Sequence, residues 1–78
     1  MYEKLKKLRI IKGFTLLQMS NKLGYSSPNA YARKEKGERK FTLDEVEIIS
    51  NLFNMSVEEI FFTDEIPIKG NRNSDQSA

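Results

Sequence analysis

The sequence has 78 residues, 38% of them hydrophobic and 31% charged, and it contains no cysteine, histidine or tryptophan. A chain of this length forms one small domain that buries about 60% of the surface its unfolded form exposes, so an enclosed active site would compete with the core for residues. Without cysteine and histidine it also lacks disulfides, thiolate nucleophiles, the common zinc ligands and the usual general base. The composition therefore argues against an enzyme and predicts a binding protein with no cofactor and no metal.

Neither a membrane span nor a secretory leader is expected from this sequence. No apolar run approaches the roughly 20 residues that a membrane-spanning helix needs. The N-terminal residues Met-Tyr-Glu-Lys-Leu-Lys-Lys lack the apolar stretch of a signal peptide. We therefore expect a cytoplasmic protein without a membrane partner.

The net charge of +2 conceals a strong asymmetry along the chain. Residues 1–41 carry eleven Lys or Arg against three Glu, a balance of +8. Residues 42–78 carry two basic against eight acidic residues, a balance of −6. A basic part that faces a polyanion, with an acidic part turned away from it, is typical of a nucleic-acid-binding protein.

Five short helices are predicted, because no strand-like alternation lasts four residues and helix signals recur at regular intervals. Apolar residues recur at helical spacing from Leu5 to about residue 12, where Gly13 closes the first helix as a left-handed cap. The second helix starts directly afterwards, because Thr15 and Gln18 form a capping box, and it ends at Gly24. Its inward-facing residues are expected to be Met19, Ser20 and Leu23.

The third helix is predicted from Pro28 to Lys36. Ser27 is a good N-cap, and proline suits the first helical position, where its missing N–H costs nothing. Gly37 ends the helix. The spacing from the second helix to the third is that of a helix-turn-helix.

Two further capping boxes, over residues 42–45 and 56–59, start the fourth and fifth helices. The expected inward residues are Val46, Ile49, Leu52 and Phe53, followed by Ile60 and Phe61. From Thr63 the composition changes to Pro, Gly, Asn, Ser and Asp. We therefore expect a folded domain over residues 1–63 and a flexible tail over residues 64–78, with Ile66 and Ile68 as its possible anchors.

Motifs from all five predicted helices resemble the Cro/cI (XRE-type) helix-turn-helix family of phage repressors. They are Leu5-Lys6-x-x-Arg9-x-x-x-Gly13-x-Thr15, Leu23-Gly24-Tyr25-Ser26, Glu35-x-Gly37 and Ser56-x-x-x-Ile60-Phe61. The resemblance runs from about Leu5 to Phe62. It implies an all-α, compact, five-helix lambda-repressor-like fold whose partner is double-stranded DNA.

The sequence departs from the family pattern in two places. The usual glutamine after the threonine of the second helix is Leu16, and the segment from Gly24 to Gly37 is one residue longer than usual. With the extra residue placed in the turn at Ser26-Ser27, the resemblance puts Tyr31 at an inward apolar position. Lys34 replaces a second inward apolar residue, which requires its methylene stem to lie on the core and its ammonium to reach water.

The resemblance also implies which residues meet the bases. Family members read DNA with the first, second, fifth and sixth residues of the second motif helix. Arginine can grip guanine O6 and N7, asparagine can grip adenine N6 and N7, and an alanine methyl can meet that of thymine. The candidate base contacts are Pro28, Asn29, Ala32 and Arg33.

Candidate phosphate contacts lie at both ends of the motif. Because Leu16 cannot replace the glutamine that touches phosphate, the backbone amides of Leu16 and Leu17 are expected to do so. Basic residues just past the third helix would run along the DNA backbone. The full set is Thr15, Leu16, Leu17, Gln18, Ser27, Lys36, Arg39 and Lys40. The resemblance further implies that Arg9 and Glu35 pair behind the reading helix and orient it.

The implied function is transcription regulation, with a repressor from a phage or another bacterial mobile element as the first expectation. Such a protein would be nucleoid-associated and would bind a palindromic operator as a homodimer. Val57, Phe62 and Ile66 are the candidate interface. A restriction-modification controller protein and an antitoxin are alternatives with the same motifs. A helical adaptor that docks on protein through Leu16, Leu17 and the segment 66–68 is an alternative of another class.

The aromatic residues could either bind single-stranded nucleic acid or pack in the core. Bases of a single-stranded nucleic acid could stack on exposed rings, whereas rings at helical spacing are expected to pack in the core. Core packing is predicted for most of Tyr2, Phe14, Phe41, Phe53 and Phe61.

Overall fold

Five helices make up the secondary structure of residues 2–62, which are the residues that the computed structural model describes. They are α1 (Glu3–Ile11), α2 (Leu16–Lys22), α3 (Pro28–Glu35), α4 (Leu43–Phe53) and α5 (Val57–Phe61). The predicted all-α, five-helix fold is confirmed, and no strand occurs in this range. The predicted tail, residues 64–78, lies outside the described residues.

Local capping signals determine where these helices begin. The side chains of four N-cap residues each accept a hydrogen bond from a backbone amide of the first turn: Thr15, Ser27, Thr42 and Ser56. Complete capping boxes form at α2, α4 and α5, as predicted. Each of these bonds satisfies one of the four backbone donors that have no acceptor within the first turn of the helix.

The predicted end of the third helix is wrong by one residue. The helix ends at Glu35, and Lys36 is its C-cap rather than its last member. The Lys36 amide still donates to the Ala32 carbonyl at 3.1 Å, so this residue belongs to the helix by hydrogen bonding. Gly37 then turns the chain away with a φ of 87°, a conformation that favours glycine.

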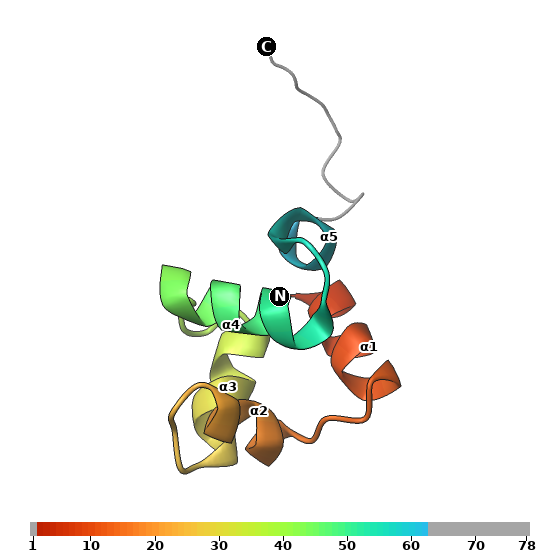
Figure 1. Cartoon of the computed structure of the whole chain (residues 1–78). Helices are drawn as coiled ribbons and strands as arrows, with labels where there is room; N and C mark the ends of the chain where they lie inside the picture. Colours follow the sequence, from red (N-terminus) through yellow and green to blue (C-terminus); the bar gives the residue numbers. More distant parts are fainter. Residues whose placement is uncertain (1, 63–78) are drawn as a thin grey trace.

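All five helices contribute to one core. Six apolar side chains are almost completely buried: Leu5, Met19, Tyr31, Ile49, Phe53 and Ile60. The helices α2 and α3 lie side by side at one end of the molecule, and α5 lies at the other end against α1 and α4 (Figure 1). This arrangement leaves one face of α3 free of other helices.

The predicted core role of the aromatic residues is confirmed. Tyr2, Phe41 and Phe61 pack edge to face, with ring centroids 5.3 to 5.5 Å apart. Phe14 stacks on Phe53 at 5.9 Å. Rings in such pairs are held by their neighbours and are not arranged as a platform for unpaired bases. No helix within residues 2–62 is long and apolar enough to cross a membrane.

Candidate nucleic-acid interface

The α2 and α3 helices are joined by a buried serine. Ser20 is fully buried, and its Oγ accepts a hydrogen bond from the Tyr31 amide at 3.0 Å and donates one to the Pro28 carbonyl at 3.4 Å. A buried hydroxyl needs such partners, because an unpaired one would be costly. This pair of bonds fixes the first turn of α3 against α2.

The candidate base-reading residues lie on α3 as the sequence predicts. Pro28, Asn29 and Arg33 are exposed, and Ala32 is half-buried. Asn29 and Arg33 are four residues apart, so both side chains project from the same face of the helix. Ser27 caps the helix, with its Oγ accepting from the Asn29 amide at 3.3 Å, and leaves the Asn29 side chain free to project.

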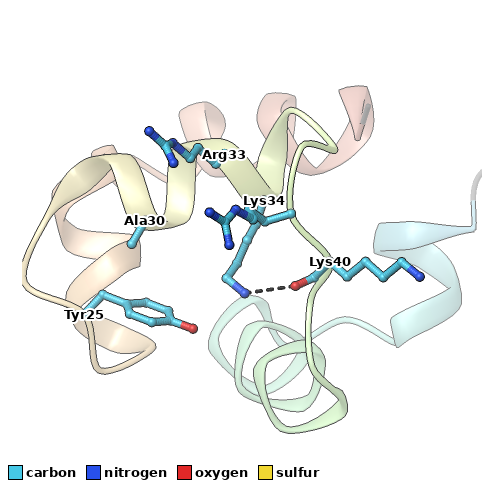
Figure 2. A pocket seen from close by; sticks show the side chains of 6 residues that line it. Tyr25, Ala30, Arg33, Lys34 and Lys40 are labelled. Atoms are coloured by element: carbon cyan, nitrogen blue, oxygen red, sulfur yellow. Dashed lines mark hydrogen bonds between the residues drawn. The ribbon is translucent and has the colours of Figure 1, made fainter.

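A hollow of about 430 Å³ lies along one flank of α3. Figure 2 shows its wall on α3, with Arg33 at the rim, Lys34 reaching into it and Tyr25 opposite. Its lining residues are Tyr25, Ala30, Arg33, Lys34, Arg39 and Lys40. The structure thus brings the predicted phosphate contact Arg39 beside the predicted base contact Arg33. For Lys40 it is the carbonyl that faces Lys34, while the side chain extends away from the hollow (Figure 2).

A smaller cavity of about 180 Å³ lies on the other flank of α3. Helical periodicity places Ala32 and Lys36 on this flank, opposite Ala30 and Lys34. The cavity is lined by Tyr2, Lys6, Arg9, Leu16, Ala32, Glu35 and Lys36. Of the predicted phosphate contacts, Leu16 and Lys36 therefore lie on one flank of α3 and Arg39 on the other, whereas Lys40 also lines the groove at Leu43 and Val57. Lys6, which was not among the predicted phosphate contacts, also lines the smaller cavity.

At the start of α2 the side chains of Thr15 and Gln18 each accept a hydrogen bond from the other residue's backbone amide. Gln18 Oε1 accepts from the Thr15 amide at 2.8 Å, and Thr15 Oγ1 accepts from the Gln18 amide at 3.1 Å. The amides of Leu16 and Leu17 belong to the same first turn, where helix amides have no acceptor within the helix. Leu16 is half-buried between α2 and α3, whereas Leu17 is exposed.

Behind α3, Arg9 and Glu35 lie in contact. The Arg9 Nε donates to Glu35 Oε2 at 2.8 Å, and a terminal nitrogen of the same guanidinium lies 3.3 Å from Oε1. Another guanidinium nitrogen donates to the Phe14 carbonyl at 3.0 Å, and the Tyr31 hydroxyl donates to Glu35 Oε2 at 2.8 Å. Burial, and then the hydrogen bond to Glu35, raise the pKa of Tyr31, so the hydroxyl keeps the proton that it donates. The network links α1 to α3 and to the loop between α1 and α2.

The expected environment of Lys34 is wrong. The Lys34 side chain is only 11% exposed, and protein groups hold its ammonium: it donates to the Lys40 carbonyl at 2.9 Å and lies 3.0 Å from Glu45 Oε1. The Tyr25 hydroxyl donates to the other carboxylate oxygen of Glu45. Burial lowers the pKa of Lys34, but the hydrogen bond and charge of Glu45 and the contact with Tyr25 outweigh it and raise the pKa.

Tyr25 and Glu45, which lie beside the site, were not among the site residues predicted from the sequence. Both stand in motifs that already had a local explanation, because Tyr25 follows the glycine of the turn and Glu45 completes the capping box of α4. A lysine at an inward helix position was the available signal, since a buried cation needs a carboxylate partner. Nothing in the sequence indicates that this partner comes from α4.

Comparison with protein families identifies the chain. A family model described as "Helix-turn-helix" matches residues 5–60. The chain therefore belongs to this XRE-type, Cro/cI-like helix-turn-helix family, and its five helices fit a lambda-repressor-like fold. Comparison with curated proteins finds no match, and comparison with solved structures finds none. Membership makes this protein a DNA-binding helix-turn-helix regulator.

Proposed function

We propose that this protein is a sequence-specific transcriptional repressor of the phage-repressor kind, which reads the major groove of duplex DNA with α3. The observation that carries the proposal is the arrangement around that helix. Asn29 and Arg33 project into solvent from one face, and cationic side chains lie on both flanks. A helix in the major groove runs between two phosphate backbones, so cations on both flanks suit this docking.

Each group of residues then has a distinct role. Arg33 and Asn29, with Pro28 and Ala32, contact base edges. The first turn of α2 and the cations on the flanks of α3 contact phosphates and fix the register. The contact between Arg9 and Glu35 holds α3 from behind, away from DNA.

We further propose that the functional unit is a homodimer on a palindromic operator. One short helix reads too few base pairs to select a site in a genome, so two copies are needed. An apolar groove of about 560 Å³ is lined by the predicted interface residues Val57 and Phe62. Leu43 and Phe62 at this groove are 75% and 60% exposed, and apolar side chains that adjoin one another on the surface suit a protein interface. The third predicted interface residue, Ile66, lies outside the described residues.

The salt dependence of duplex binding tests the proposed function. Each phosphate neutralised by Lys or Arg releases counterions, so the logarithm of the binding constant should fall with the logarithm of salt concentration by about 0.9 per contact. We expect a steep slope that reflects several contacts. A slope near zero, or equal affinity for an unrelated acidic protein, would instead indicate the adaptor function that docks on protein.

A further inference from the structure

A cluster of the half-buried Tyr25 and the buried Lys34 and Glu45 connects four parts of the molecule. Lys34 belongs to α3, Glu45 to α4, and Tyr25 to the turn between α2 and α3. The Lys34 ammonium lies 3.0 Å from Glu45 Oε1 and 5.6 Å from the centroid of the Tyr25 ring. It also donates at 2.9 Å to the Lys40 carbonyl in the loop after α3, as Figure 2 shows.

The polar groups of this cluster are well satisfied. Glu45 Oε1 accepts from the Thr42 amide at 2.9 Å as well as from Lys34, and Oε2 accepts from the Tyr25 hydroxyl. Burial raises the pKa of Glu45, but the bonds from Tyr25, Thr42 and Lys34 outweigh it and lower the pKa. The pair is therefore charged at neutral pH.

Stability alone is a weak reason for a buried ion pair, because apolar residues of similar volume often stabilise such a site equally well. What the charged pair adds is a directional bond to the Lys40 carbonyl. An apolar side chain at position 34 would fill the same space but would leave that carbonyl without this donor.

The loop between α3 and α4 is held from two sides. Its first residues bond to the end of α3: the Gly37 amide donates to the Lys34 carbonyl at 3.0 Å, and the Glu38 amide donates to the Arg33 carbonyl at 2.8 Å. The Arg39 amide also lies 3.3 Å from the Arg33 carbonyl. The bond from Lys34 to Lys40 holds the loop on the other side of Arg39.

We propose that the cluster of Tyr25, Lys34 and Glu45 is a positioning device for DNA binding. It fixes the loop so that the exposed Arg39 side chain meets a backbone phosphate beside α3. Lys34 then acts on DNA through Arg39, although Lys34 itself is buried. This inference rests on the proposed function.

The test is the double variant Lys34→Met/Glu45→Gln in the full chain. It leaves the net charge unchanged, and glutamine preserves the capping box at α4 because Gln serves at that position as well as Glu. We expect a folded protein that has lost about one phosphate contact. Its loss of affinity between about 50 and 200 mM salt should then be about 3.5-fold smaller than that of the wild type, with the same base preferences.

Two comparisons make the outcome specific. The charge-matched control Lys7→Met/Glu47→Gln alters exposed residues of α1 and α4 and should keep the wild-type salt dependence. In an Arg39→Ala background, Lys34→Met/Glu45→Gln should produce no further change, because the residue through which it acts is gone.

A wild-type salt dependence in the folded double variant would overturn the inference. An additive effect on top of Arg39→Ala would also overturn it. If the double variant does not fold, Tyr25→Phe removes the hydroxyl bond to Glu45 without a change in charge, and it should reduce the salt dependence in the same direction. An unchanged salt dependence in that variant counts against the inference. A wild-type protein that does not bind duplex DNA would mean that the proposed function itself fails.

Discussion

Arg33 and Lys34 are neighbours in the sequence but have opposite environments. Arg33 is exposed on the face that projects from the molecule, whereas the side chain of Lys34 is buried against α4. Successive residues of a helix point about 100° apart, so two adjacent cations can serve different purposes. Arg33 is available to a base, and Lys34 is available only to protein atoms.

Replacing Arg33 should alter what the protein reads. Arg33→Ala removes a possible two-pronged grip on guanine, so we expect a loss of about 1–3 kcal/mol at the best site and relaxed preference at one base position. Arg39→Ala should weaken binding to all sequences about equally, because a phosphate looks the same under every base. Binding measured on a panel of single-base variants of the best site distinguishes the two.

An effect of Arg39→Ala on base preference, without one of Arg33→Ala, would contradict the assigned reading face. If Arg33→Ala leaves base preferences unchanged while Arg39→Ala alters them at one position, the extra residue does not lie at Ser26-Ser27. The reading face of α3 would then have to be reassigned.

The Glu45 carboxylate should make stability depend on acid pH. Its pKa lies below the ordinary value of 4.5, so the folded state favours the charged form. The stabilisation is present above the unfolded pKa and is lost as the pH falls through the lower, folded pKa. At neutral pH, Glu45→Gln leaves Lys34 as an unpaired buried charge, with an expected cost of about 3 kcal/mol.

The measured quantity is the difference in the free energy of unfolding between the wild type and Glu45→Gln. The free energy of unfolding of the wild type should approach that of Glu45→Gln as the pH falls from about 5 to 3, measured by urea denaturation. Glu59, whose pKa is also lowered by its bonds with Ser56, is present in both proteins and cancels. A difference that stays constant over this range would contradict the assignment.

At the scale of elements, the helices owe their positions to short-range signals. Capping boxes involve residues three apart, and a glycine with positive φ acts on its own backbone. Such signals can be recognised in the sequence, which is why the starts of α2 to α5 were predicted. The start of α1 at Glu3 was not predicted, because its N-cap Tyr2 makes no side-chain capping bond. The burial of Tyr31 and the approach of Arg9 to Glu35 were expected from the family resemblance rather than from any local signal.

The partners of Lys34 could not be predicted in the same way. Glu45 is 11 positions away in the sequence and belongs to another helix, so its approach depends on how α3 and α4 pack. The grouping of cations on the flanks of α3 likewise depends on how the helices pack. Lys6 and Lys36 line the same cavity because α1 packs against α3.

The shortest helix should be the most sensitive to its cap. The α5 helix has five residues, and its N-cap Ser56 accepts from the Glu59 amide at 3.1 Å. Ser56→Ala should lower the free energy of unfolding by about 1 kcal/mol, because it leaves that amide without its acceptor. Ser26→Ala, at an exposed turn residue, is the matched control and should have little effect in the same denaturation experiment. Equal effects of both changes would mean that the cap does not stabilise α5.

At the scale of the whole molecule, the charge asymmetry of the sequence follows the order of the helices. The basic residues of positions 1–41 lie on α1 to α3 and the adjoining loops. Within the described residues, the acidic residues after position 41 lie on α4 and α5. The apolar groove at Leu43, Val57 and Phe62 lies with the acidic helices. One part of the molecule thus suits a polyanion, and another part can receive a second copy.

Selection of bound duplexes from a random-sequence pool tests the central claim that α3 reads bases in the major groove. If two copies each insert one α3, the enriched DNA should be a palindrome whose half-sites lie about one helical turn, roughly 34 Å, apart. Recovery of duplexes that share no motif would contradict base reading by α3, and a single half-site without symmetry would contradict the homodimer.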